Sequence, residues 1–511
     1  MKKLLGILFH RFTIISVAIL AQAVFFVFMI EKFKNTFVYV YAFLLILSFI
    51  VAFYILTGRS NPAYKIAWVV PIILFPIFGG IFYVTFGQVR LTKREKKQMG
   101  LVATDVVKYK QENNEIIETL EKYDKIASCN AKYLFNYAHS PIWERTELKY
   151  FDIGEKKFET LVEELKKAEH FIFMEYFIIS EGRMWNTILD ILKEKAAAGV
   201  DVRVIYDDAG CMFTLPYGYD KKLEKMGIKC KIFNKFVPIF NMVFNNRDHR
   251  KICVIDGNVG FTGGINLADE YINEIVRFGH WKDTAVMLKG DAVWNLTLFF
   301  LSMWSYLANT EEDYLEYRPD KYHELPAVGD GYVQPFADTP LDSECVGETV
   351  YLNMITKAQK YIYITTPYLV IDNEMVTALT IAAKNGVDVR IITPHIEDKW
   401  YVHAVTRSYY EILVESGVKI YEYTPGFIHA KSYICDDKYA VVGTINMDYR
   451  SLYLHFECGV LMCGSSTVLD VKRDFEETQA LSEEITLEKC RSVPAVTRFF
   501  RTCLRMFAPL L

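Results

Sequence analysis

The sequence of 511 residues lacks the usual signatures of metal and nucleotide chemistry. It contains no HExxH pair, no P-loop and no cluster of carboxylates, so no motif calls for a metal ion or any other cofactor. Its ten cysteines are scattered without a CxxC pair, which is typical of reduced, mostly buried thiols. The net charge is only −4 and there is no broad basic patch, which argues against nucleic acid as a partner.

Apolar residues are abundant instead, at 52% hydrophobic and 15% aromatic, with a mean hydropathy of +0.11. Three uncharged stretches, 12–30, 37–57 and 66–86, each approach the ~20 residues that a helix needs to cross a bilayer. No small-residue cleavage site follows the first, so we expect an anchor with two or three transmembrane helices rather than a signal peptide.

Basic residues flanking these stretches indicate the orientation of the chain. Seven lie on one side, including the run "RLTKREKK" (90–97), and five lie on the other. Because cytoplasmic loops carry the excess of lysine and arginine, the larger C-terminal part is predicted to be cytoplasmic. The sequence therefore predicts a multi-pass protein of the cell membrane with the bilayer as a partner.

Beyond residue 145 the chain contains an internal duplication. Short β-rich runs alternate with charged helical stretches, a pattern that predicts an α/β fold. "AAAGVDVRVIYDD" (196–208) recurs as "AAKNGVDVRIITP" (382–394), and "LEKMGIKCKIF" (223–233) recurs as "LVESGVKIYEY" (413–423). The chain is therefore expected to hold two copies of one α/β unit.

Each copy ends in the same polar motif. "HRKICVIDGNVGFTGGIN" (249–266) is matched by "HAKSYICDDKYAVVGTIN" (429–446), so both read His-x-Lys-x4-Asp-x6-Gly-x2-Asn. Two such motifs at equivalent places in a repeat exceed what chance would give. The candidate catalytic residues are those of the two motifs: His249, Lys251, Asp256, His429, Lys431 and Asp436.

The spacing of the motif indicates which side chains act together. Residues two apart on a strand share a face, so His249 projects with Lys251, and His429 projects with Lys431. Asp256 and Asp436 lie an odd number of residues after these histidines and lysines, so they do not share their face of a strand. This favours a structural or salt-bridging role for the two aspartates. Two imidazoles and two ammonium groups suit a phosphodiester, because one imidazole can attack phosphorus while the other protonates the leaving oxygen.

Other residues are expected to support this chemistry. Asn266 and Asn446 follow glycine-containing turns and are candidate amide donors to phosphate oxygens. Asp283 in "HWKDTAV" and Glu457 in "HFECGVL" stand at equivalent places in the two units and are candidates for orienting the histidines. The sequence does not show which histidine each of these two carboxylates contacts.

These motifs resemble the phospholipase D superfamily and are most similar to its bacterial cardiolipin synthase branch. Supporting segments include "NNRDHRK", "TGGINLADEY", "TPYLVIDNE", "NMDYRS" and the terminal "FAPLL". The resemblance implies two α/β sandwich domains about a pseudo-twofold axis, a phosphohistidine intermediate and no cofactor. It implies phosphatidylglycerol as substrate and cardiolipin plus glycerol as products. It adds Gly264 and Thr444 as supporting residues, with Thr444 standing where the family usually has serine.

One alternative function stays open, and two others are disfavoured by the residues present. A membrane-bound phospholipase D that hydrolyses or transphosphatidylates other lipids would use the same intermediate and differ only in the acceptor. A membrane scaffold with decayed units would be expected to have lost one of the histidines or lysines. A metal-dependent synthase that uses CDP-diacylglycerol should show D-x2-D-G-x2-A-R, which is absent.

The organisation predicted from these patterns has five parts. They are a membrane anchor (1–90), a basic linker (91–145), two phospholipase D-like domains (146–325 and 326–490) and an amphipathic C-terminal helix (491–511). In the last part, Arg498, Arg501 and Arg505 recur at helical spacing among aromatic and leucine residues. That pattern is typical of a helix lying in a lipid interface.

Overall fold

The computed structural model describes two units of the chain. The described residues are 37–58, 61–74, 108–109, 114–235, 246–324, 329–342 and 344–510, with Val24, Val27, Glu31, Lys32, Tyr83 and Pro326. The smaller unit takes in residues 1–90 and 235–245, and the larger unit takes in 91–234 and 246–509.

The smaller unit contains helix α3 (Phe37–Thr57) packed against helix α4 (Pro62–Leu74). Ile55, Trp68 and Ile72 are buried between them, and Lys65 Nζ donates to the carbonyl of Leu56 at 3.1 Å. Among the described residues, no helix combines the length and apolar character needed to cross a bilayer. The stretch 12–30 and most of 75–86 lie outside the described residues.

The larger unit is built on two sheets with the same strand order. The first sheet runs β1-β9-β7-β6-β2-β3-β4. Its strands are β1 (Thr146–Phe151), β2 (Phe171–Tyr176), β3 (Asp201–Asp207), β4 (Lys229–Phe233), β6 (Lys251–Ile255), β7 (Val259–Gly263) and β9 (Ala285–Gly290). Strands β2, β3 and β4 are parallel, and β6 joins β2 antiparallel.

The second sheet runs β10-β19-β17-β16-β11-β13-β14-β20. Its strands are β10 (Tyr332–Asp338), β11 (Tyr361–Thr365), β13 (Asp388–Pro394), β14 (Lys419–Tyr423), β16 (Ser432–Cys435), β17 (Tyr439–Gly443), β19 (His455–Cys463) and β20 (Ser482–Ile485). Strands β11, β13 and β14 are parallel, and β16 joins β11 antiparallel. Apart from β20, the order repeats that of the first sheet, so the duplication read from the sequence is present in the topology.

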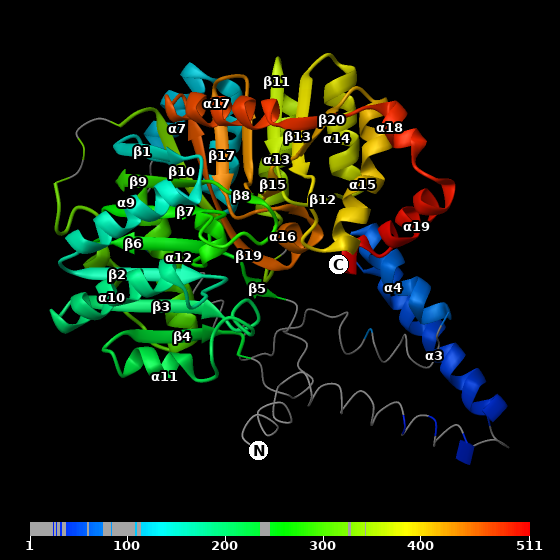
Figure 1. Ribbon diagram of the computed structural model, residues 1–511, viewed down its shortest axis with the longest axis horizontal. Helices are drawn as coiled ribbons and strands as arrows, with labels where there is room; N and C mark the ends of the chain where they lie inside the picture. Colours follow the sequence, from blue (N-terminus) through cyan, green and yellow to red (C-terminus); the bar gives the residue numbers. More distant parts are fainter. Residues whose placement is uncertain are drawn as a thin grey trace. The chain divides into compact units, whose positions relative to one another are not determined.

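Helices cover the sheets and connect their strands (Figure 1). The first half contains α9 (Gly154–Lys167), α10 (Arg183–Ala197), α11 (Tyr219–Glu224) and α12 (Val293–Ala308). The second half contains α13 (Val346–Lys357), α14 (Asn373–Lys384), α15 (Trp400–Glu415), α16 (Tyr449–Tyr453), α17 (Thr467–Ala480), α18 (Leu487–Ser492) and α19 (Ala495–Arg505). Short 3-10 turns lie at η2 (Asp269–Ile272), η3 (Tyr314–Tyr317) and η4 (Ala508–Leu510).

Central strands are apolar on both faces because both faces are covered. In β6, Ile252 and Val254 point into a core shared with α12 and strands of the second sheet, while Cys253 and Ile255 point towards the α9 and α10 side. Helix α12 is almost wholly buried in the shared core. The two halves therefore form one folded body, with a single apolar layer joining their sheets. All ten cysteines are free thiols, as the sequence predicted.

The domain boundaries predicted from the sequence remain predictions. The first sheet falls within 146–325, and the second falls within 326–490 apart from β5 (Arg247–Asp248), which pairs with β19. The expected linker, 91–145, includes helices α7 (Asn114–Tyr123) and α8 (Lys125–Tyr137). Tyr133 on α8 donates a 2.7 Å hydrogen bond to Glu344, which ties this segment to the second half.

Candidate active site

Both motif histidines lie where a short strand of one half pairs with the other half. Strand β5 (Arg247–Asp248) runs parallel to the start of β19, and the next amide, of His249, donates to the carbonyl of Phe456 at 2.9 Å. Strand β15 (Gly426–Ile428) likewise runs parallel to β8 (His280–Lys282), and the amide of His429 donates to the carbonyl of Lys282 at 2.7 Å. Each histidine is therefore positioned by backbone from the opposite half.

The carboxylates that orient the histidines also come from the opposite half. His249 Nδ1 lies 2.9 and 3.0 Å from the two carboxylate oxygens of Glu457. His429 Nδ1 lies 2.7 Å from Asp283 Oδ2. All four side chains are buried. A carboxylate on Nδ1 holds its proton there and leaves Nε2 free for chemistry. The sequence predicted both carboxylates, and the structure adds that the pairs cross between the halves.

Each motif lysine folds back onto its own histidine. Lys251 Nζ donates to the carbonyl of His249, and Lys431 Nζ donates to the carbonyl of His429. Lys431 Nζ also lies 2.8 Å from His429 Nδ1. Both lysines are almost completely buried, and neither forms an ion pair with a carboxylate within the described residues. Two ammonium groups held this way are available to an anionic ligand.

Burial sets the protonation of these groups. It lowers the pKa of His249 and of His429 well below the ordinary 6.5, and the nearby Lys251 and Lys431 lower both further. Burial also lowers the pKa of Lys251 to about 8 and that of Lys431 to about 7. It raises the pKa of Asp283 to about 7. Both imidazoles are therefore neutral at neutral pH, the form that a nucleophile requires.

The motif aspartates lie apart from this chemistry. Asp256 accepts hydrogen bonds from the amides of Glu169, His170 and Phe171, each at 2.8 Å. Asp436 does the same for residues 359–361, at 2.8–2.9 Å. Both have positive φ, 48° and 55°, at the turn after β6 or β16. We therefore revise their assignment to the catalytic set: the carboxylates anchor the backbone at the start of β2 and β11, in line with their strand parity.

The supporting residues act mostly on the carboxylates. Thr444 Oγ1 donates to Glu457 Oε2 at 2.5 Å and accepts from the amide of Cys458 at 2.9 Å. At the equivalent position of the first half, a Cβ on Gly264 would stand 2.0 Å from Asp283 Oδ1. Glycine is thus needed there to make room for Asp283, while threonine braces Glu457. Their direct contact with phosphate stays a prediction.

The two asparagines differ in their contacts. Asn266 is occupied on both sides, since its oxygen accepts from the amide of Ile178 at 3.0 Å and its nitrogen donates to the hydroxyl of Tyr271 at 2.7 Å. The side-chain oxygen of Asn446 is buried without a hydrogen-bond partner among the described residues. An amide oxygen accepts hydrogen bonds and cannot donate to a phosphate oxygen, so the phosphate contact stays a prediction for both asparagines.

Aromatic residues complete the surroundings of each histidine. Phe177 packs edge-on against His249 with ring centres 5.0 Å apart, and Tyr271 packs against His429 at 5.6 Å. Trp281 lies 5.7 Å from His429. Neither Phe177 nor Tyr271 is among the candidate site residues predicted from the sequence: Phe177 lies just after β2, outside the histidine–lysine motifs, and Tyr271 lies in η2, at the end of the segment "TGGINLADEY". They pack against the imidazoles, which are both less than one-tenth exposed.

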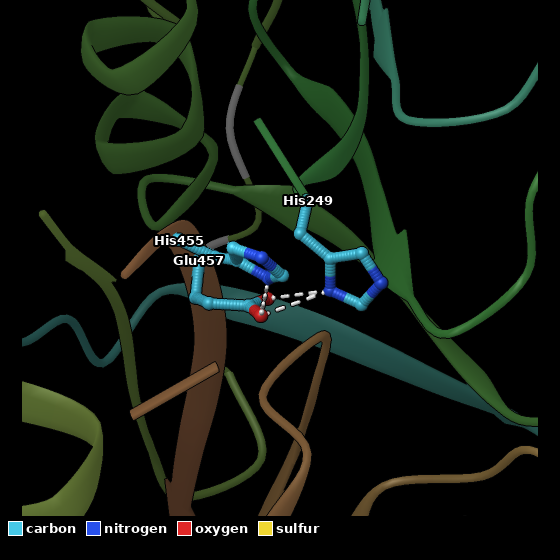
Figure 2. Close-up of side chains that lie close together, drawn as sticks. All are labelled: His249, His455 and Glu457. Atoms are coloured by element: carbon cyan, nitrogen blue, oxygen red, sulfur yellow. Dashed lines mark hydrogen bonds and ion pairs between the residues drawn. The ribbon is translucent and has the colours of Figure 1, made fainter. Parts of the chain in front are cut away.

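His455 occupies, beside His249, the place that Trp281 occupies beside His429. Its ring centre lies 5.6 Å from that of His249, and its Nδ1 lies 3.7 Å from Glu457. Figure 2 shows both imidazoles next to this carboxylate, each joined to it by a dashed line. The three side chains are close enough to hold a metal ion together. The 2.9 Å contact between His249 and Glu457 is, however, already the one that would orient the candidate catalytic histidine.

Comparisons with known proteins bear on the family and the fold of the chain. A family model described as "Cardiolipin synthase, PLD-like domain" matches residues 161–278 and 351–479, one segment in each half. A second, "Phospholipase_D-nuclease N-terminal", matches residues 46–88. The solved phosphatidylserine synthase of Haemophilus influenzae aligns with a TM-score of 0.58 at 15% identity, covering 76% of this chain and 100% of its own. That likeness shows the fold.

Fold and paired site together define a phospholipase D-like protein. An uncharacterized protein of Streptococcus mutans is 46% identical over 459 residues, 90% of this chain and 99% of its own length. A cardiolipin synthase of a Geobacillus strain is 37% identical over 469 residues, 90% of this chain and 91% of its own length. The chain belongs to the cardiolipin synthase family.

The crossed pairs predict a specific pattern of coupling. We expect His249→Ala and Glu457→Gln to be non-additive in stability, with a coupling of about 1–2 kcal/mol, because both remove partners of one buried pair. Thermal unfolding of the two single variants and the double variant in detergent measures it. His249→Ala combined with Asp283→Asn is the matched control, and a larger coupling there would mean that each half uses its own carboxylate.

The revised role of the motif aspartates predicts a stability effect. Asp436→Asn should lower the free energy of unfolding by about 2 kcal/mol, because a neutral amide replaces a carboxylate that accepts three backbone hydrogen bonds. Turnover of the remaining folded protein should change little. The control is Asp437→Asn in the same turn, whose half-exposed carboxylate pairs with Lys472 and should contribute less than about 1 kcal/mol. Loss of turnover in folded Asp436→Asn would restore a catalytic role.

The buried lysines predict an alkaline limb in the pH profile. Above pH 7–8 the ligand-free site loses the protons of Lys431 and Lys251, so kcat/KM should fall as pH rises. A bound phosphodiester favours the charged lysines, so the limb of kcat should lie at higher pH. Initial rates from pH 6 to about 10 test both. A kcat/KM that stays flat up to the ordinary lysine range would contradict the assignment.

Proposed function

We propose that this protein is a cardiolipin synthase that transfers the phosphatidyl group of one phosphatidylglycerol to a second, releasing glycerol. The observation that carries the proposal is the pair of buried imidazoles, each held on Nδ1 by a carboxylate of the other half and each beside a buried lysine. The cardiolipin synthases among the relatives support the choice of lipid.

In the first step, Nε2 of one histidine attacks phosphorus, and we assign this role to His249. The bond from phosphorus to the glycerol oxygen breaks, and His429 in its protonated form gives that oxygen its proton. The enzyme then carries a phosphatidyl group on nitrogen, and glycerol leaves. The negative charge of the phosphodiester favours the protonated form of His429, which is neutral in the empty site.

In the second step, His429, now neutral, accepts a proton from a glycerol hydroxyl of a second phosphatidylglycerol. The hydroxyl oxygen bonds to phosphorus, the phosphorus–nitrogen bond breaks, and His249 is restored. Lys251 and Lys431 stabilise negative charge on the non-bridging oxygens in both steps. The exchange replaces one phosphodiester with another, so it needs neither a nucleotide nor another energy source.

The surroundings of the site favour a lipid acceptor over water. Phe177, Tyr271 and Trp281 pack around the imidazoles, and both imidazoles are less than one-tenth exposed. Water would divert the same intermediate to phosphatidic acid, the outcome expected of a membrane-bound phospholipase D. Limited access of water therefore supports transfer over hydrolysis.

We further propose that the protein is a multi-pass protein of the cell membrane with its catalytic halves in the cytoplasm. Helix α3 carries 21 uncharged residues, and many of its large apolar side chains are exposed, among them Phe43, Ile46 and Phe53. The match of residues 46–88 to an N-terminal family model and the excess of basic residues at 90–97 support this attachment and orientation.

Lipid product analysis tests the proposed reaction. Purified protein incubated with phosphatidylglycerol vesicles should produce cardiolipin and free glycerol in equal amounts, without nucleotide and in the presence of EDTA. His249→Ala and His429→Ala should each lower the rate by at least about a thousandfold, since each removes a group that takes part in both steps.

The products separate the competing functions. Phosphatidic acid as the main product would make the protein a hydrolase, and no turnover with any phospholipid would support a scaffold. The positive control for folding is the thermal unfolding of each alanine variant in the same detergent.

A further inference from the structure

The C-terminal helix α19 turns its arginines towards the protein. It packs on α15, where Arg505 donates to the carbonyl of Ser408 at 3.2 Å and its guanidinium lies 5.3 Å from the ring centre of Tyr409. Two turns further back, Arg498 lies 3.8 Å from Glu411 of the same helix α15. Arg498 and Arg505 thus lie on the side of α19 that contacts α15, the helix beside which Figure 1 draws it.

The apolar face of α19 points outward. Val496 is 80% exposed and Phe499 is 72% exposed, and Phe500 and Met506 are also exposed. Trp400, at the start of α15, is 57% exposed and stacks with Phe500 at 6.3 Å between ring centres. A helix on a water-exposed surface normally has the opposite polarity. An exposed apolar face of this kind, with Trp and Phe at its centre, is typical of a surface covered by lipid.

Beneath α19 lies a cavity of about 350 Å³ with an excess of positive charge. Its charged lining consists of five basic residues, His395, Arg407, Lys489, Arg498 and Arg501, and two acidic residues, Glu411 and Glu422. The carboxylate of Glu422 is occupied by Arg407 at 2.7–2.8 Å and by His395 at 2.9 Å. Glu411 is shared between Arg491 and Arg498 at 3.6 and 3.8 Å.

Arg501 differs from the other arginines of this lining in its ion pairing. It forms no ion pair with any carboxylate in the part of the chain that the structure describes. Partial burial and then the like charge of Arg407 lower its pKa. A guanidinium held beside another guanidinium is stabilised by an anion with several oxygens, which it can bind in a bidentate manner.

We propose that α19 docks on the surface of a membrane, with its outward residues Val496, Phe499 and Phe500 among the lipids and the phosphate of an anionic phospholipid bound at Arg501 and Arg498 in the cavity. The apolar face and the basic cavity adjoin each other, as the acyl region and the charged headgroup do in a lipid. The proposal of this second lipid site does not depend on the histidine chemistry or on which reaction the protein catalyses.

The test uses the full chain in nanodiscs, with a photo-crosslinking phenylalanine derivative in place of Phe499. We expect crosslinks to lipid, and more of them in discs that contain phosphatidylglycerol than in discs of phosphatidylcholine alone. Arg498→Gln with Arg501→Gln should remove that preference, by about fivefold for each arginine. The same probe in place of Phe213, which is 69% exposed in the first half, is the matched control and should show no dependence on lipid charge.

Each other outcome would overturn the proposal. Crosslinks from position 499 to a second copy of the chain would make this face a protein interface. Equal lipid crosslinking in charged and neutral discs would contradict the binding of a lipid phosphate in the cavity. Absence of lipid crosslinks would contradict the contact of α19 with the membrane. None of these readouts requires turnover, so they remain distinct from a failure of the proposed reaction, and thermal unfolding checks that the arginine variants fold.

Discussion

The hydrogen bonds that cross between the two halves, from His249 to Glu457 and from His429 to Asp283, are the contacts on which the site depends. Each is accompanied by a short parallel strand pair, β5 with β19 and β15 with β8, that fixes the backbone of the histidine. Neither half alone holds a complete histidine–carboxylate pair. Association of the halves is therefore a condition for assembling the candidate site.

The crossing has an energetic consequence. Burying two histidines, two lysines and two carboxylates is costly, because each charge loses its hydration. Burial shifts the pKa values of the histidines and lysines downward and that of Asp283 upward, so the empty site carries less charge than its composition implies. An anionic phosphodiester favours the charged lysines again. The anionic substrate thus stabilises the protonated lysines, which neutral water in the same place would not do.

The two halves have diverged where their surroundings differ. Thr444 braces Glu457 through its hydroxyl, whereas Gly264 makes room for Asp283. His455 lies beside His249 and Trp281 beside His429. These differences give the two imidazoles unequal surroundings within a repeated fold. The C-terminal helix α19, with its inverted polarity, belongs to the second half alone.

The sequence by itself determined the duplicated α/β unit, the paired histidines and lysines, the two orienting carboxylates and the family, because repeats and motif spacings are written along the chain. It could not assign the partner of each carboxylate, since Glu457 lies 208 residues from His249 and Asp283 lies 146 residues from His429. Only the tertiary structure decided this crossing, the backbone role of Asp256 and Asp436, the walls formed by Phe177 and Tyr271, and the direction in which α19 turns its arginines. Each depends on contacts between segments far apart in the chain, and strand parity or helical periodicity reports only which residues share a face.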